Sequence, residues 1–199
     1  MDRLTPGILL QAYQAGIFPM GDDVTGAIGW YAPDPRGILP LDDFHVPDNL
    51  ARLVRQDPFE VVSDRDFAAT IRACADRERT WITPPVIDAY TELHETGYAH
   101  SVECWQEGKL VGGLYGVAIR GAFFGESMFY CVSNASKVAL VHLVRQLRVG
   151  GYTLLDVQYS NPHLEQFGVV EISRDAYQQR LADALQREAT WWPRDTAPA

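Results

Sequence analysis

Residues 99–158 limit the fold of this 199-residue chain more than any other part. In this stretch, strand-type runs lie on both sides of a single long amphipathic helix. Turn signals at Glu107-Gly108 and Arg120-Gly121 separate the first three runs, and Gly150-Gly151 ends the helix. An antiparallel meander followed by a strand–helix–strand crossover predicts an α+β fold with a mixed β-sheet flanked by helices. The elements expected here are strands over 99–106, 109–119, 122–125 and 152–158 and a helix over 136–149.

Further helices and two short strands are expected on either side of this stretch. Thr5-Pro6 is a typical helix start, with Thr as N-cap and Pro in the first turn, and Gly16 follows the expected helix end. The tail from Trp191 onward is expected to be loose. The other expected elements are helices over 47–56, 66–76, 84–95, 161–167 and 173–187 and strands over 59–62 and 169–172.

The segment 30–37 separates the first helix from the rest of the chain. It carries Trp, Tyr and two prolines, so we expect neither a helix nor a central strand there. We place a boundary in this segment. The predicted organisation is a small N-terminal lobe over 1–34 and a main domain over 35–199.

Several classes of protein are disfavoured by composition. No apolar run approaches the roughly 18 residues that a membrane span needs, and the N-terminus lacks the layout of a signal peptide. A cytoplasmic protein without a membrane partner is therefore expected. Cys74, Cys104 and Cys131 are far apart and are read as buried reduced thiols. Because no Cys/His cluster has metal-ligand spacing, we expect no metal. We expect no cofactor either.

The formal net charge of −9 argues against broad, sequence-independent binding of nucleic acid over the whole surface. The charge is uneven, because the stretch 52–79 balances its acidic residues with six arginines. A polyanionic partner would therefore have to be met by a local patch.

Two groups of polar residues could carry chemistry. Asp156 and Gln158 lie two apart on an expected strand, so both face the same side of the sheet. They are either a structural hydrogen-bonded pair or an ordered relay in a cleft. Glu126 follows Gly125 at the expected end of a strand, where ligands often bind and where Gly lets a substrate approach the backbone. Alternatively, Glu126 caps the next helix or pairs with an arginine.

Other candidates are ambiguous on the residues alone. Leu140, Leu143 and Leu147 recur at helical spacing, which is typical of a core stripe. Trp30 and Trp81 could belong to a core or could stack on a base. Asn161 is expected to cap a short helix.

A set of short strings runs in order over nearly the whole chain. They are A-Y-Q-A-G-I-F-P at 12–19, W-Y-A-P-D-P-R at 30–36, T-W-I at 80–82, G-G-L-Y-G-V at 112–117, F-G-E-S-M-F at 124–129, N-A-S-K at 134–137, L-D-V-Q at 155–158 and N-P-H at 161–163. Each string is weak by itself. Together they resemble the leucyl/phenylalanyl-tRNA–protein transferase family.

The resemblance implies a bacterial cytoplasmic enzyme whose main domain is similar to the GNAT acetyltransferase fold. Such an enzyme takes Leu or Phe from aminoacyl-tRNA and adds it to a protein with an N-terminal Arg or Lys, which marks that protein for degradation. We expect Met to be accepted as well, and we expect a monomer.

Roles follow from the resemblance for individual residues. It implies that Asp156 and Gln158 form an orienting relay and that Glu126 meets the basic acceptor. It also implies that Gly125 and Asn161 contact substrate. By the same resemblance, the pocket for the transferred side chain falls on Leu114, Phe123, Leu140, Leu143, Leu147 and Leu155.

The nucleic acid is expected to meet the chain at two places. Arg52 and Arg55 match a basic patch of the family that touches the tRNA backbone; the alternative is a solvated helix face. Some relatives have a Trp that stacks on the terminal adenine where this chain has Met20. Because Met cannot stack as an aromatic ring does, the remaining aromatic candidates are expected to share that role. They are Tyr13, Trp30 and Trp81.

Two other functions remain as alternatives. One is a GNAT-type N-acyltransferase that uses acyl-CoA, although the loop before Ser136 lacks the R/Q-x-x-G-x-G/A string that binds pyrophosphate in such enzymes. The other is a non-catalytic reader of basic protein N-termini, which would need an anion like Glu126 but neither the Asp–Gln pair nor a tRNA patch.

Overall fold

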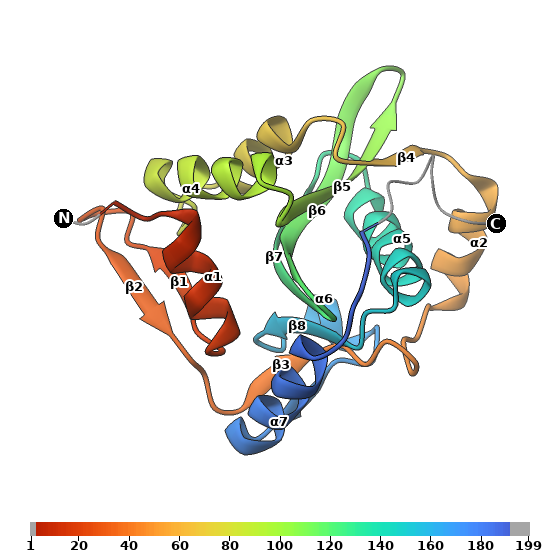
Figure 1. Ribbon diagram of the computed structural model, residues 1–199. Coiled ribbons are helices and arrows are strands. Elements are labelled where there is room, and N and C mark those ends of the chain that lie inside the picture. Colours follow the sequence, from red (N-terminus) through yellow and green to blue (C-terminus); the bar gives the residue numbers. More distant parts are fainter. Residues whose placement is uncertain (1–2, 192–199) are drawn as a thin grey trace.

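The computed structural model describes residues 3–191 and confirms the α+β class, with a mixed sheet covered by helices (Figure 1). Among these residues, no helix is both long enough and apolar enough to cross a membrane. The strands are β1 (Phe18–Gly21), β2 (Ile28–Tyr31), β3 (Arg36–Ile38), β4 (Glu60–Ser63), β5 (Ala99–Gln106), β6 (Lys109–Ile119), β7 (Ala122–Tyr130), β8 (Leu154–Gln158) and β9 (Val170–Ile172). The helices are α1 (Pro6–Gln14), α2 (Asp48–Gln56), α3 (Phe67–Ala75), α4 (Pro84–Glu95), α5 (Ala135–Gly150), α6 (Pro162–Glu165) and α7 (Arg174–Leu185).

The main sheet has seven strands in the order β4-β5-β6-β7-β8-β3-β9, and β1 and β2 pair separately. Neighbouring strands of this sheet run antiparallel, except β7 and β8, which are parallel. The parallel pair arises because α5 crosses back between them, as the meander and crossover pattern predicts. The end of α5 is set by Gly151, whose φ of 82° is costly for a residue with a side chain.

Helices cover both faces of the sheet, and each face has its own apolar core. One core joins residues of α1, α3, α4 and α7 to the sheet, and the other joins residues of α2 and α5 to it. Tyr13 and Leu9 of α1 are fully buried in the first core, beside Tyr90 of α4. The N-terminal helix thus packs on the same side as α4 (Figure 1), which brings an early segment of the chain close to the middle of the sheet.

The expectation for 30–37 was wrong in part. Arg36–Ile38 forms β3, an interior strand between β8 and β9. Three residues are too few to give a strand pattern, and this strand pairs with segments far along the chain. Residues 18–21 and 28–31 also form a hairpin, although Pro19 interrupts the pattern. Proline is tolerated there because a two-stranded ribbon has free edges.

The third strand is longer than expected, because β7 continues past Gly125 to Tyr130. Its register with β6 shifts between Tyr115 and Gly116, which pair with Ser127 and Gly125. Glu126 is therefore the extra residue of a β-bulge rather than a residue beyond the strand end.

Two smaller expectations were also wrong. Cys131 is exposed, whereas Cys74 and Cys104 are buried as expected. Trp191 is packed against Phe123 and His100 rather than loose. The rest of the expected loose tail, 192–199, lies outside the described residues.

We predict that Gly37→Ala destabilises the protein, because a Cβ at this position of β3 would lie 2.8 Å from the backbone carbon of Tyr159 and 2.9 Å from the nitrogen of Ser160. Backbone atoms cannot swing aside as a flexible side chain can, so we expect a loss of about 1–3 kcal/mol in the free energy of unfolding. Denaturant titration measures it.

Gly7→Ala in α1 is the matched control, because a Cβ there meets nothing within 4 Å. This change should be neutral or stabilising, since Ala is the better helix former. Equal stability of the two variants would contradict the close approach at β3.

Candidate active site

A cavity of about 620 Å³ opens beside the parallel strand pair, a size typical of small-molecule sites. Its walls come from β6, β7, β8, α5, α6 and the segment that follows α3. Nine residues singled out from the sequence line it. They are Trp81, Leu114, Gly125, Glu126, Leu140, Leu143, Leu155, Gln158 and Asn161.

Two residues expected in the apolar pocket do not line the cavity. Phe123 and Leu147 are fully buried and belong to the core that also contains Leu140, Leu143 and Leu155. They form a layer behind the leucine wall, a name used here for the cavity-lining side chains of Leu114, Leu140, Leu143 and Leu155. For Leu147, helical spacing could not show this, because a stripe three and four residues apart continues along α5 past the point where the cavity ends.

Asp156 is fully buried and forms a bidentate ion pair with Arg36, which is 1% exposed. Arg36 Nε donates to Asp156 Oδ1 at 3.0 Å, and Nη2 donates to Oδ2 at 2.7 Å. Tyr177 of α7 donates its hydroxyl to Oδ2 at 2.7 Å. Arg36 also donates to the carbonyl of Gly16 at 3.1 Å. This pair therefore ties β8, β3, α7 and the segment after α1 together.

Asp156 holds the backbone of Gln158 rather than its side chain. The Gln158 N–H donates to Asp156 Oδ1 at 2.9 Å. Gln158 has a φ of 60°, a left-handed conformation that costs a side-chain-bearing residue free energy. The Nε2 of Gln158 is buried and has no hydrogen-bond partner within residues 3–191. Gln158 is one of the residues that line the cavity, so this unmet donor lies in the cavity wall.

Glu126 faces the same cavity from the bulge of β7, and two phenols hold it. Tyr13 donates to Oε1 at 2.6 Å, and Tyr90 approaches Oε2 at 3.3 Å. Burial raises the pKa of Glu126 from 4.5 to about 8; the nearby Asp156 adds to the rise, while Tyr13, Tyr90 and Arg36 oppose it. Near pH 7 this carboxyl is therefore mostly protonated.

The two phenols remain proton donors at neutral pH. Burial, followed by the charge of Glu126, raises the pKa of Tyr13 and of Tyr90 well above 10.0. The two hydroxyls also contact each other. Because Tyr13 belongs to α1 and Tyr90 to α4, Glu126 depends on the packing of the N-terminal helix.

The candidates for base stacking lie in different surroundings. Trp81 lines the cavity, and Trp30 is 43% exposed on β2. Tyr13 is fully buried, so its ring is closed off from a ligand. Met20 is partly buried and packs against the core beneath α1 and α4. Of these candidates, Trp81 is the one that lines the cavity.

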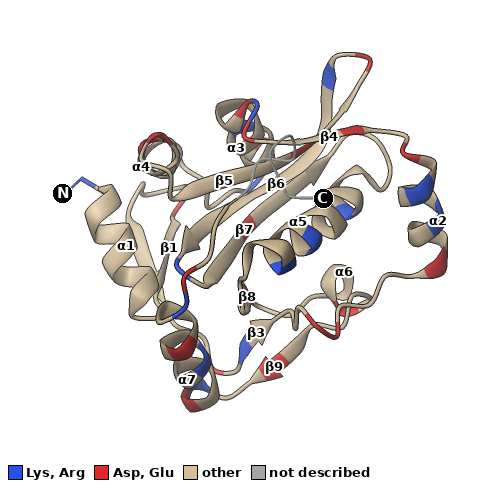
Figure 2. Ribbon diagram, turned by 45° about the vertical axis from the view of Figure 1, so that its right-hand side comes forward, with Lys and Arg blue, Asp and Glu red and all other residues tan. Residues whose placement is uncertain are grey.

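Arg52 and Arg55 are exposed on α2, away from the cavity lining. Figure 2 shows Lys or Arg positions, coloured blue, along both α2 and α5, which lie on the same side of the sheet. A polyanion crossing this side would meet positive charge, although the chain as a whole is acidic.

Four residues of the site received no separate role from the sequence. The only sequence evidence for Arg36, Tyr115 and His163 was that each lies in one of the short strings that carry the family resemblance. Tyr115 lines the cavity, and its buried hydroxyl has no hydrogen-bond partner among residues 3–191. Arg77 also lines it, and its Nη2 donates to Ser127 Oγ at 3.0 Å and to the Met128 carbonyl at 2.7 Å.

His163 places a neutral imidazole in the cavity wall. Its Nε2 is buried and lacks a hydrogen-bond partner in the described part of the chain. Burial, followed by the charge of Lys137, lowers the pKa of His163. The cavity thus combines a leucine wall with a neutral acid, an amide and an imidazole, while Asp76 and Arg77 add charge to its lining. The neutral groups are suited to placing reactants.

Comparison with known proteins agrees on one family. The leucyl/phenylalanyl-tRNA protein transferase model matches residues 38–182, and the model of that family's N-terminal domain matches residues 2–34. A leucyl/phenylalanyl-tRNA–protein transferase of Salinibacter ruber is 66% identical over 198 residues, which cover 100% of this chain and 88% of that protein. One from Paramagnetospirillum magneticum is 52% identical over 204 residues, covering 100% of this chain and 97% of that protein.

Among solved structures, the chain is similar to a GCN5-related N-acetyltransferase from Kribbella flavida. The TM-score is 0.47 at 14% sequence identity, and the match covers 84% of this chain and 61% of that chain.

We predict that Glu126 makes stability fall as pH rises. Between pH 4.5 and about 8, the folded chain keeps a proton on Glu126 that the unfolded chain releases, so this contribution is complete below 4.5 and is lost toward 8. Glu126→Gln removes the effect. Relative to wild type, the variant should gain on the order of 3–5 kcal/mol in the free energy of unfolding between pH 5 and pH 9.

Urea titrations at both pH values measure this difference. Glu95→Gln, an exposed change on α4, serves as the control and should leave the pH dependence as in wild type. Parallel curves for wild type and Glu126→Gln would contradict the raised pKa.

Proposed function

Because this chain belongs to the leucyl/phenylalanyl-tRNA–protein transferase family, we propose that it transfers Leu or Phe from aminoacyl-tRNA to the α-amine of an acceptor protein. The observation that carries the proposal is the joining, in one cavity, of a leucine wall, the Glu126 carboxyl and the Gln158 side chain, whose Nε2 has no hydrogen-bond partner among the described residues. The leucine wall suits the side chain of the transferred amino acid, Gln158 suits the reacting ester, and Glu126 suits the basic acceptor.

The reaction depends more on correct placement of the amine and the ester than on a strong base. An α-amine has a pKa of about 8, so a useful fraction is neutral near pH 7. Gln158 is a poor base, but its amide can orient the amine or the ester carbonyl. Asp156 contributes by holding the Gln158 backbone. We propose the Asp–Gln relay in this sense, as a means of positioning.

Glu126 is proposed to select acceptors that begin with Arg or Lys. An empty site keeps this carboxyl mostly protonated at pH 7, and an arriving cation lowers its pKa and so favours the charged form. Since the guanidinium of Arg is always charged, such an acceptor brings its own counter-ion. The buried site would otherwise penalise a lone anion.

The transferred side chain is proposed to rest on Leu114, Leu140, Leu143 and Leu155. An aliphatic wall contributes little discrimination, since one methylene group is worth only about 1–3 kcal/mol. We therefore propose that Met is accepted along with Leu and Phe. Gly125 and Asn161 lie at the same cavity and are proposed to contact the aminoacyl end.

The tRNA is proposed to cross α2, where Arg52 and Arg55 meet its backbone, and to place its terminal adenine against Trp81. Two or three phosphate contacts would give a shallow dependence of affinity on salt. We further propose a cytoplasmic monomer without a cofactor whose products are marked for degradation.

The proposal is tested by incubating the protein with labelled Leu-tRNA or Phe-tRNA and peptides that differ only at the first residue. Label should pass to peptides beginning with Arg or Lys and not to a peptide beginning with Ala. Glu126→Ala should reduce the preference for basic first residues by at least about tenfold in kcat/KM, because the anion is lost.

Two outcomes would replace this function by another. Transfer from acyl-CoA but not from aminoacyl-tRNA would favour an ordinary N-acyltransferase. Binding of the basic peptides without transfer of label would favour a non-catalytic reader of N-termini.

A further inference from the structure

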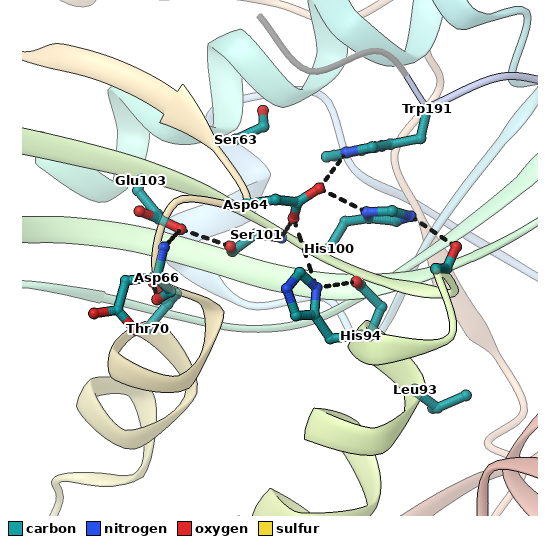
Figure 3. Close-up of polar contacts among 12 residues, drawn as sticks. Ser63, Asp64, Asp66, Thr70, Leu93, His94, His100, Ser101, Glu103 and Trp191 are labelled. Carbon is teal, nitrogen blue, oxygen red and sulfur yellow. Dashed lines mark hydrogen bonds and ion pairs between the residues drawn. The ribbon is translucent and has the colours of Figure 1, made fainter.

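The end of the described chain is fastened to the sheet beside the cavity wall. Trp191 donates its indole Nε1–H to Asp64 Oδ2 at 2.8 Å. Its ring stacks on His100 with centroids 4.4 Å apart and on Phe123 with centroids 5.5 Å apart. Figure 3 shows Trp191 beside Asp64 and His100. The indole therefore has one polar and two aromatic contacts that fix its position.

Asp64 makes hydrogen bonds to several of the groups around Trp191. Its Oδ1 accepts the backbone N–H of Ser101 at 2.8 Å, and its Oδ2 lies 2.8 Å from His100 Nδ1 (Figure 3). The side chains of Asp64 and His100 are only 18% and 9% exposed. Hydrogen bonds to a carboxylate are stronger than those between neutral groups, so the carboxylate holds the indole in a defined place.

The same carboxylate and two imidazoles, Asp64, His94 and His100, have the composition of a zinc site. Their distances fit hydrogen bonds better. His94 Nδ1 lies 2.8 Å from the Ala99 carbonyl and 4.0 Å from Asp64, whereas His100 lies 2.8 Å from Asp64. Ligand atoms around a tetrahedral zinc ion would be evenly spaced, about 3.3 Å apart. We therefore regard the cluster as a support for Trp191.

Phe123 connects Trp191 to the cavity. Phe123 pairs with Leu155 across the parallel strands β7 and β8, so the two side chains are neighbours on one face of the sheet. Leu155 lines the cavity, whereas Phe123 stands in the layer behind it. Because protein interiors are close-packed, a change behind the wall alters the space in front of it.

We infer that Trp191 is a positioning residue that sets the depth of the leucine wall and thereby the preference between Leu and Phe. This role rests on the proposed function. The match to the family model ends at residue 182, before Trp191. Without the indole, Phe123 gains room to move back, and the wall retreats with it. A deeper pocket favours the larger side chain of Phe.

The test compares kcat/KM for Phe-tRNA and Leu-tRNA with a common Arg-peptide. In Trp191→Ala, the Phe/Leu ratio should rise by about fivefold or more over wild type, given what a few buried atoms contribute to discrimination. Trp191→Phe keeps a stacking ring but loses the bond to Asp64, so its ratio should rise less. A merely structural role would lower both rates together and leave the ratio unchanged.

Trp105→Ala is the matched control, because Trp105 lies on β5 away from the cavity lining and donates to Glu103. Its ratio should stay at the wild-type value. If Trp191→Ala fails to fold, Trp191→Phe decides alone. Unchanged ratios in the folded Trp191 variants, with a wild type that transfers both residues, would overturn the role of Trp191. A wild type that transfers neither would contradict the proposed function instead.

Discussion

The buried ion pair between Arg36 and Asp156 is the interaction on which the site depends. Charges this deeply buried are tolerated only when they are paired and hydrogen-bonded. Arg36 meets this demand with Asp156 and the Gly16 carbonyl, and its guanidinium lies 4.8 Å from the ring centre of Phe18 and 4.5 Å from that of Tyr177. Removing one partner of such a pair costs about 3–5 kcal/mol, so β3 cannot leave β8 without a large loss.

Two backbone irregularities on neighbouring strands aim the polar groups of the cavity. Gln158 ends β8 in a left-handed conformation that its bond to Asp156 stabilises. Glu126 is the extra residue of a bulge in β7, held by Tyr13 and Tyr90. Both depend on elements outside the parallel strand pair, namely β3, α1 and α4. The N-terminal helix is therefore part of the site, although its tyrosine is closed off from the cavity.

The sequence predicted the fold class and the crossover because period-2 and helical patterns are local. It also predicted that Asp156 and Gln158 would share one face, as regular strand geometry requires. The left-handed backbone of Gln158 ends that alternation, so Gln158 lines the cavity while Asp156 is turned to Arg36 and Tyr177. It could not predict the partner of Asp156, because Arg36 lies 120 residues away. Nor could it place Phe123 behind the wall rather than in it, or give Trp191 a position. Those outcomes depend on register, on a one-residue bulge and on packing between distant segments, none of which leaves a local pattern.

The most direct test of this account is a double-mutant cycle of Asp156→Ala and Gln158→Ala, measured as the single-turnover rate of Leu transfer to an Arg-peptide. Unfolding is checked for each variant, because the ion pair also stabilises the fold. If Asp156 acts by holding Gln158, each single variant slows transfer and the double variant is no slower than the slower single one. Losses that multiply in the double variant, or normal rates in both single variants, would contradict the account.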